Sequence, residues 1–136
     1  MANTFYWYDL ETTGTNPKWD RIVQFAGLRT DAELNPVGEP LCFYMQLPED
    51  VLPNPDASLV TGITPSKLAA KGVSEYEGLQ KIMQELNTPE TCALGYNSLR
   101  FDDEFLRYSL YRHLQDPYAR EYRNGNTRWD IVDLVR

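Results

Sequence analysis

Histidine and cysteine are scarce in this sequence of 136 residues, which has one histidine and two cysteines. Cys42 and Cys92 both fall in predicted strands and form no cluster of metal ligands, so we expect two buried, reduced thiols and no disulfide. Long apolar runs are absent too: none approaches the ~20 residues that cross a bilayer, and no cleavable signal pattern opens the chain. These absences favour a cytoplasmic protein that does not enter a membrane.

Basic residues are also few, with 13 Lys and Arg against 20 Asp and Glu and a net charge of −7. Proteins that grip nucleic acid usually carry a basic surface, so the charge alone argues mildly against a nucleic-acid enzyme. Otherwise the composition is that of a folded globule, since 42% of the residues are hydrophobic and nine are tyrosine. At this length we expect one domain with a real core.

The most informative segment is Tyr8-Asp9-Leu10-Glu11-Thr12-Thr13-Gly14, which continues an aromatic run that starts at Phe5. The run is typical of a β-strand, in which alternate side chains point to the same face. Asp9 and Glu11 therefore project together near the end of a strand, where two carboxylates repel each other and lose hydration. A bound proton or cation relieves the repulsion between the two carboxylates. Oxygen-rich clusters select hard divalent ions such as magnesium or manganese. The alternative is a polar turn in which Asp9 or Thr12 caps the next element.

Hydrophobic patterning predicts an α/β chain whose first three strands are antiparallel. The predicted strands are 5–8, 21–30, 41–47 and 91–96. The predicted helices run from Thr64-Pro65 to Gly72, from the capping box at Ser74 to Asn87, and from about Phe101 to Gln115, the last capped by Asn97 or Ser98. We expect a loop at 120–126 and the start of another amphipathic helix at 129–136. Alternation predicts that Ile22 and Phe25 lie on opposite faces of the second strand.

Three motifs resemble those of the DEDD superfamily of 3′→5′ exonucleases. They are Asp9-Leu10-Glu11-Thr12-Thr13-Gly14, Thr61-Gly62-Ile63-Thr64-Pro65, and Gly95 to Glu104 with its Asn-x-x-x-Phe-Asp pattern. The sequence in and around these motifs is most similar to the bacterial exonuclease I family. The similarity extends over nearly all of this chain but covers only the front part of that family's usual length. The resemblance implies a ribonuclease-H-like mixed sheet with flanking helices, and we expect 1–136 to be the N-terminal part of such a domain.

The resemblance also implies a function, which is processive 3′→5′ hydrolysis of single-stranded DNA in DNA repair, with release of 5′-mononucleotides. Two ions, Mg²⁺ or Mn²⁺, would be held by Asp9, Glu11 and Asp102, with Asp9 touching both. The implied substrate contacts are Leu10, Thr12, Thr13, Asn97 and Phe101. Contact with single-strand-binding protein would use parts downstream of this chain, and we expect a monomer.

Asp102 is preferred over Asp103 as the third acid because it follows Phe101 as the catalytic Asp does in that superfamily. Asp103 and Glu104 fit a helix N-terminus, where the dipole favours acids. If the strand at 91–96 lies beside the first strand, we expect Asp102 to approach Asp9 and Glu11 at the carboxyl ends of the strands.

The third superfamily motif, His-x-x-x-x-Asp or Tyr-x-x-x-Asp, does not occur downstream of the second. Asp130 and Asp133 come too early, and we expect for them a supporting or helix-surface role. His113 is expected to be a solvated helix residue. We therefore expect half a catalytic set, and an isolated chain that is inactive or strongly impaired.

Two other functions stay open from the sequence. One is a DEDD nuclease that acts on RNA or oligonucleotides, and the other is a non-catalytic remnant of the fold that binds nucleic acid or a protein. Basic and aromatic residues at Arg107-Tyr108, Tyr111-Arg112 and 118–128 are candidates for contact with DNA. For the helix residues among them we favour packing of Tyr108 and Tyr111 against the sheet.

Overall fold

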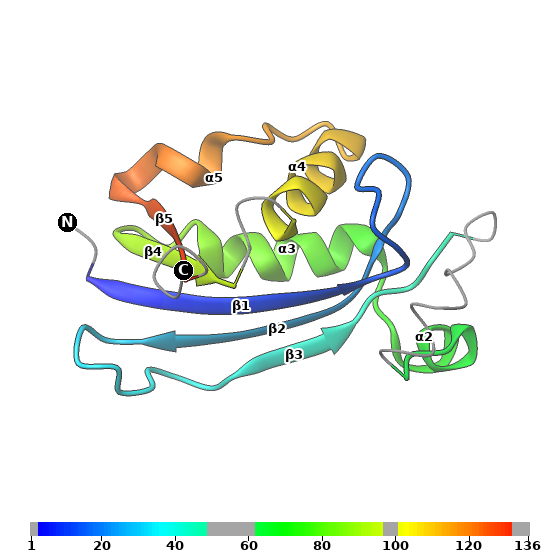
Figure 1. The fold of residues 1–136 in the computed structure, drawn as a ribbon, viewed down its shortest axis with the longest axis horizontal. Coiled ribbons are helices and arrows are strands. Elements are labelled where there is room, and N and C mark those ends of the chain that lie inside the picture. The colour runs from blue at the N-terminus through cyan, green and yellow to red at the C-terminus, as the bar shows by residue number, and fades with distance from the viewer. Residues whose placement is uncertain (1–2, 49–61, 97–100, 132–136) are drawn as a thin grey trace.

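The computed structural model describes residues 3–48, 62–96 and 101–131. The chain alternates strands with helices, and Figure 1 shows α3 and α4 against one side of the sheet and α2 beyond the end of β3. The elements are β1 (Thr4–Thr12), β2 (Ile22–Thr30), β3 (Leu41–Tyr44), α2 (Pro65–Lys71), α3 (Glu75–Leu86), β4 (Thr91–Gly95), α4 (Asp102–Arg112), α5 (Ala119–Tyr122), η1 (Arg123–Gly125) and β5 (Thr127–Asp130). No helix in these segments has the length and apolarity to cross a membrane.

The strands form one mixed sheet in the order β3-β2-β1-β4-β5. β1 pairs antiparallel with β2, and β2 pairs antiparallel with β3, whereas β4 runs parallel to both β1 and β5. This confirms the predicted mixed sheet with three antiparallel strands first. Because β1, β4 and β5 are parallel, their carboxyl ends lie at the same edge, where α/β proteins usually place their sites.

The helices begin where the sequence predicts a cap. Thr64 and Ser74 each accept a hydrogen bond from the backbone N–H three residues later, at Lys67 and Glu77. The apolar stripe of α3 is buried against the sheet, as are the inner residues of α4. The main core joins both helices to one face of β1 and β2, and its members include Tyr6, Tyr8, Leu10, Phe25, Leu79, Ile82, Leu86, Phe105, Leu106 and Leu110.

The pairing of β1 with β2 shifts register between Glu11 and Thr12, so that Thr12 lies opposite Ile22. Ile22 joins the same core cluster as Phe25, whereas Val23 packs with α2. The prediction that Ile22 and Phe25 lie on opposite faces is therefore wrong, because a register shift resets the alternation of a strand.

Several other predictions of local structure are wrong. The segment at 120–126, predicted as a loop, holds most of α5 and all of η1. Residues 127–130 form the strand β5, whereas a helix was predicted to begin at 129. Pairing with the open edge of β4 outweighs the helical spacing of the apolar residues there. Helix α4 is preceded by Phe101 without a side-chain cap, and the predicted caps at 97 and 98 lie outside the described residues. Cys42 is exposed, while Cys92 is buried as expected.

Candidate active site

Asp9 and Glu11 lie on the face of β1 that α3 and α4 leave open. Leu10 between them is buried in the core, whereas Asp9 is exposed and Glu11 is half-buried. β4 pairs with β1 as far as Trp7, which lies opposite Leu94, and ends one residue later at Gly95. Asp9 and the residues after it on β1 therefore extend past the end of β4. Asp9 borders a hollow of about 390 Å³ on this open face, which Trp7 and Leu28 also line.

Asp102 begins α4, after the chain leaves the end of β4. Only 3% of the residue is exposed. Burial raises the pKa of Asp102 to about 8, and the carboxylate of Asp9 is the next largest cause, followed by Asp103, Glu11 and Asp130. Burial and the carboxylate of Asp9 also raise the pKa of Glu11. The carboxyl edge of the parallel strands is therefore a place where negative charges crowd.

One carboxylate oxygen in this group is unsatisfied. Oδ2 of Asp102 is buried and has no hydrogen-bond partner among the described residues. A buried acid is normally paired, protonated or bound to a metal. The oxygen donors of Asp102 and of its carboxylate neighbours are the kind that a hard divalent cation prefers. In the described segments, however, no three His, Cys, Asp or Glu side chains stand close enough together to form a ready-made metal cluster. Metal binding by Asp9, Glu11 and Asp102 stays a prediction.

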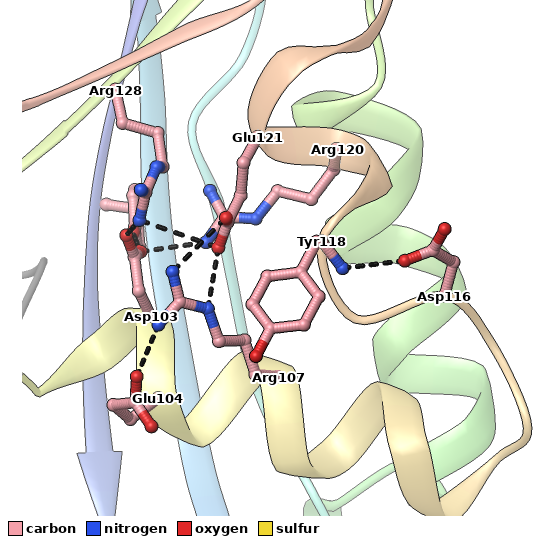
Figure 2. Close-up of polar contacts among 9 residues, drawn as sticks. Asp103, Glu104, Arg107, Asp116, Tyr118, Arg120, Glu121 and Arg128 are labelled. Carbon is pink, nitrogen blue, oxygen red and sulfur yellow. Dashed lines mark hydrogen bonds and ion pairs between the residues drawn. The ribbon is translucent and has the colours of Figure 1, made fainter.

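Asp103 has a different environment from its neighbour. It is fully buried, and Oδ1 accepts hydrogen bonds from the Tyr8 hydroxyl and from Arg120 at 2.8 Å, while Oδ2 accepts one from Arg128 at 2.5 Å. Burial alone would raise the pKa of Asp103, but Arg120 and the hydrogen bonds from Tyr8, Arg120 and Arg128 hold it below its ordinary value. The helix dipole alone therefore does not account for Asp103, which is the buried centre of an ion-pair network (Figure 2).

The partners of Asp103 were not predicted from the sequence. Arg120 is in a stretch expected to be a loop, and Arg128 is in one left open for contact with DNA. No local pattern links these arginines to a residue 17 or 25 positions earlier. An Arg that is 3% exposed, such as Arg120, can be recognised only once its acidic partner is known.

Asp130 lies at the end of β5, opposite Gly95 at the end of β4. Only 2% of it is exposed, so the expected helix-surface role is wrong. It is among the groups that raise the pKa of Asp102, which places it near that acid. Asp133 lies outside the described residues.

The residues predicted to contact the substrate differ in which of their groups are free to do so. The side chain of Leu10 is in the core, so only its backbone could touch a ligand. The hydroxyls of Thr12 and Thr13 donate to Gly14 O and Asp20 Oδ1, at 2.7 Å and 2.9 Å. Phe101 packs against Phe105 with ring centroids 4.9 Å apart. Asn97 lies outside the described residues.

His113 is not the solvated residue that we predicted. It caps the C-terminal end of α4, and its Nε2 lies 2.8 Å from Glu75 Oε1. Asp102 begins the same helix, whose 11 residues span about 16 Å. The chain's one histidine is therefore remote from the candidate acids and bonded to a carboxylate on α3.

A second hollow, of about 220 Å³, lies beside α4 and is lined mainly by aromatic and charged side chains. Tyr111 in its wall is 70% exposed, so the prediction that it packs against the sheet is wrong. Tyr118 faces the hollow as well, and the Arg107 guanidinium lies 5.0 Å from the centre of its ring. Exposed aromatic rings of this kind are one element of surfaces that bind single-stranded nucleic acid, whereas the charge of Arg107 is already paired with Glu104 and Glu121.

An exonuclease family model, exonuclease relatives and solved exonuclease structures all match this chain. The family model described as exonuclease matches residues 6–136. Exodeoxyribonuclease I of Haemophilus influenzae is 50% identical over 133 residues, which are 98% of this chain and 28% of the relative. A crystal structure of Escherichia coli exonuclease I in complex with a dT13 oligonucleotide is 47% identical with a TM-score of 0.95, covering 98% of this chain and 29% of that one.

A structure of an ExoI/SSB-Ct complex is 47% identical with a TM-score of 0.96, covering 99% of this chain and 30% of that one. The likeness confirms the ribonuclease-H-like fold. The chain spans less than a third of the length of these relatives.

Proposed function

This chain belongs to the exonuclease family, and on that premise we propose that it supplies metal-binding acids for the removal of nucleotides from the 3′ end of single-stranded DNA. The products would be 5′-mononucleotides. The observation that carries the proposal is the buried, unpartnered oxygen of Asp102 beside the carboxylates of Asp9 and Glu11. A non-catalytic remnant of the fold has no need for this arrangement, because unpaired buried acids destabilise a protein.

The residues that would hold two divalent ions, Mg²⁺ or Mn²⁺, are Asp9, Glu11 and Asp102. Bound there, such ions activate a water molecule and stabilise the departing 3′ oxygen. The donor set is made of carboxylate oxygens, which suits these hard ions. Asp9 is exposed while Asp102 is buried, so Asp9 is the acid that is open to an approaching substrate.

The protein groups around these acids orient the substrate. We propose that the backbone after Glu11, where β1 shifts register and turns at Thr12 and Thr13, meets the 3′-terminal nucleotide. The hydroxyl of Thr13 also accepts from Arg21 N at 3.0 Å. This bond and the bond to Asp20 hold the turn in one shape. His113 does not take the proton from water, because it is bonded to Glu75 at the far end of α4.

We propose that the rest of the DNA strand runs over the hollow beside α4. Tyr111 and Tyr118 offer exposed rings for stacking. The Arg107 guanidinium lies 5.0 Å from the centre of the Tyr118 ring, but its charge is paired with Glu104 and Glu121. The oligonucleotide complex of the E. coli relative supports single-stranded DNA as the substrate. Likewise, the ExoI/SSB-Ct complex supports single-strand-binding protein as a partner.

The experiment that tests this function uses a hybrid in which residues 1–136 replace the matching segment of E. coli exodeoxyribonuclease I, to which the chain is 48% identical over its whole length. Single-stranded DNA labelled at its 5′ end should shorten progressively from the 3′ end when Mg²⁺ or Mn²⁺ is added. Duplex DNA and RNA of the same sequence serve as controls. Cleavage that is internal, independent of metal or equally fast on RNA would overturn the proposal.

A further inference from the structure

The ion-pair network around Asp103 is made of three carboxylates and three guanidiniums, so its formal charges balance, and Asp103 and Arg120 are its buried members. The members are Asp103, Glu104, Glu121, Arg107, Arg120 and Arg128. Figure 2 shows these side chains meeting between α4 and α5. Arg128 reaches both Asp103 and, at 3.5 Å, Glu121, and thereby ties β5 to the two helices. Three separate elements, α4, α5 and β5, thus share one set of ion pairs, and β1 joins them through the hydrogen bond from Tyr8 to Asp103.

This network touches the chain neighbours of two candidate metal ligands. Tyr8 precedes Asp9 on β1, and its hydroxyl donates to Asp103, which follows Asp102 on α4. Tyr8 is 6% exposed and Asp103 is 0% exposed, so the bond is shielded from water. Buried bonds of this kind hold their partners in one geometry more firmly than exposed ones do.

Fixing Tyr8 and Asp103 restricts the residues beside them. Successive side chains of a strand point to opposite faces, so holding the Tyr8 side chain against the helices sets the direction of Asp9 toward the open face. In the same way, holding Asp103 sets the rotation of the first turn of α4 and hence the direction of Asp102. Oδ1 of Asp103 accepts hydrogen bonds from Tyr8 and Arg120, and Oδ2 accepts one from Arg128. Both oxygens are therefore already engaged within the protein.

We propose that Asp103 and Tyr8 are positioning residues, which set the spacing of Asp9 and Asp102 for divalent metal binding without touching the metal themselves. This inference rests on the proposed function, because it presumes that Asp9 and Asp102 hold the ions. Residues that orient metal ligands in this indirect way typically change metal affinity or activity about 10- to 100-fold when they are altered. We expect a change of this size when the bond between Tyr8 and Asp103 is removed.

The test measures Mn²⁺ affinity of the 136-residue chain by the electron paramagnetic resonance signal of free Mn²⁺, at a temperature well below the melting transition. Tyr8→Phe removes only the hydroxyl that donates to Asp103. Tyr6→Phe is the matched control, since Tyr6 lies two residues earlier on the same face of β1 and its buried hydroxyl has no hydrogen-bond partner in the described segments. We expect Mn²⁺ affinity to fall about tenfold in Tyr8→Phe and to stay unchanged in Tyr6→Phe.

The outcomes separate this inference from the proposed function. Failure of the parent chain to bind Mn²⁺, or binding that survives Asp9→Ala, would overturn both. Binding that is lost in Asp9→Ala but equal in parent and Tyr8→Phe would overturn the positioning role alone. If circular dichroism shows that Tyr8→Phe is unfolded, Arg128→Gln and Arg128→Lys decide instead. Weakened Mn²⁺ binding in the first with partial rescue in the second supports the role, and parent-like binding in both refutes it.

Discussion

Replacing Asp102 by Asn should stabilise the metal-free chain, and by an amount that grows with pH. The pKa of Asp102 is raised from 3.8 to about 8 by burial and by the carboxylates of Asp9, Asp103, Glu11 and Asp130. The folded state therefore holds the Asp102 proton more tightly than the unfolded state does. Its contribution to stability is full below about pH 4 and is lost as the pH rises through about 8.

The size of the effect is set by the shift in pKa. A change of about 4 pH units, at about 1.4 kcal/mol per unit, amounts to roughly 5 kcal/mol between the two ends of this window. Asn cannot ionise and keeps the shape of the protonated acid, so Asp102→Asn escapes the loss. In a chain of 136 residues this corresponds to a melting temperature about 10 °C or more above the parent at pH 8, with little difference at pH 4.

The assay is thermal unfolding monitored by circular dichroism from pH 4 to pH 9, in the presence of a chelator and then of millimolar Mg²⁺. Added Mg²⁺ should raise the melting temperature of the parent and leave Asp102→Asn unchanged, because a ligand stabilises only the state that binds it. Asp103→Asn is the control and should destabilise, since it weakens the buried pairs with Arg120 and Arg128. Parallel pH profiles for parent and Asp102→Asn would refute the reasoning.

Three further predictions concern the same site and fold. Asp9→Ala should abolish DNA cleavage by the hybrid enzyme without lowering the melting temperature of the metal-free chain, because it removes a proposed metal ligand and relieves carboxylate repulsion; a large drop in melting temperature would make Asp9 structural. The chain by itself should degrade labelled single-stranded DNA about 10²- to 10⁴-fold more slowly than the E. coli enzyme, since His113 cannot act as general base. A rate near that of the E. coli enzyme that is lost in Asp9→Ala would contradict this prediction. Ser74→Ala should lower the free energy of unfolding by about 1 kcal/mol in urea titrations, because Glu77 N loses its cap at the start of α3; an unchanged midpoint would show that the cap contributes nothing.

Much of the fold could be predicted from local patterns. The caps at Thr64 and Ser74 and the apolar stripe of α3 are short-range signals, and each gives the observed helix. The alternation in β1 correctly separates the exposed Asp9 from the buried Leu10. These features depend on residues that are close in the sequence, so local propensity and packing agree.

The wrong predictions concern features that depend on contacts between residues far apart in the sequence. β5 forms because β4 offers it an edge, and the spacing of Trp129 and its neighbours does not reveal that edge. The role of Asp103 depends on Arg120 and Arg128, whose partners are set by the tertiary fold. Sequence reasoning could separate Asp102 from Asp103 only by resemblance, whereas the structure separates them by what each carboxylate contacts.

The central claim is that Asp9, Glu11 and Asp102 bind divalent metal. The most direct test is anomalous X-ray diffraction from crystals of the chain soaked in Mn²⁺, with Asp9→Ala crystals as the control. We predict anomalous peaks bonded to carboxylate oxygens of Asp9, Glu11 and Asp102 in the parent and their loss in the variant. Mn²⁺ bound at Asp103, bound only at acids elsewhere on the surface, or unchanged in Asp9→Ala would contradict the claim.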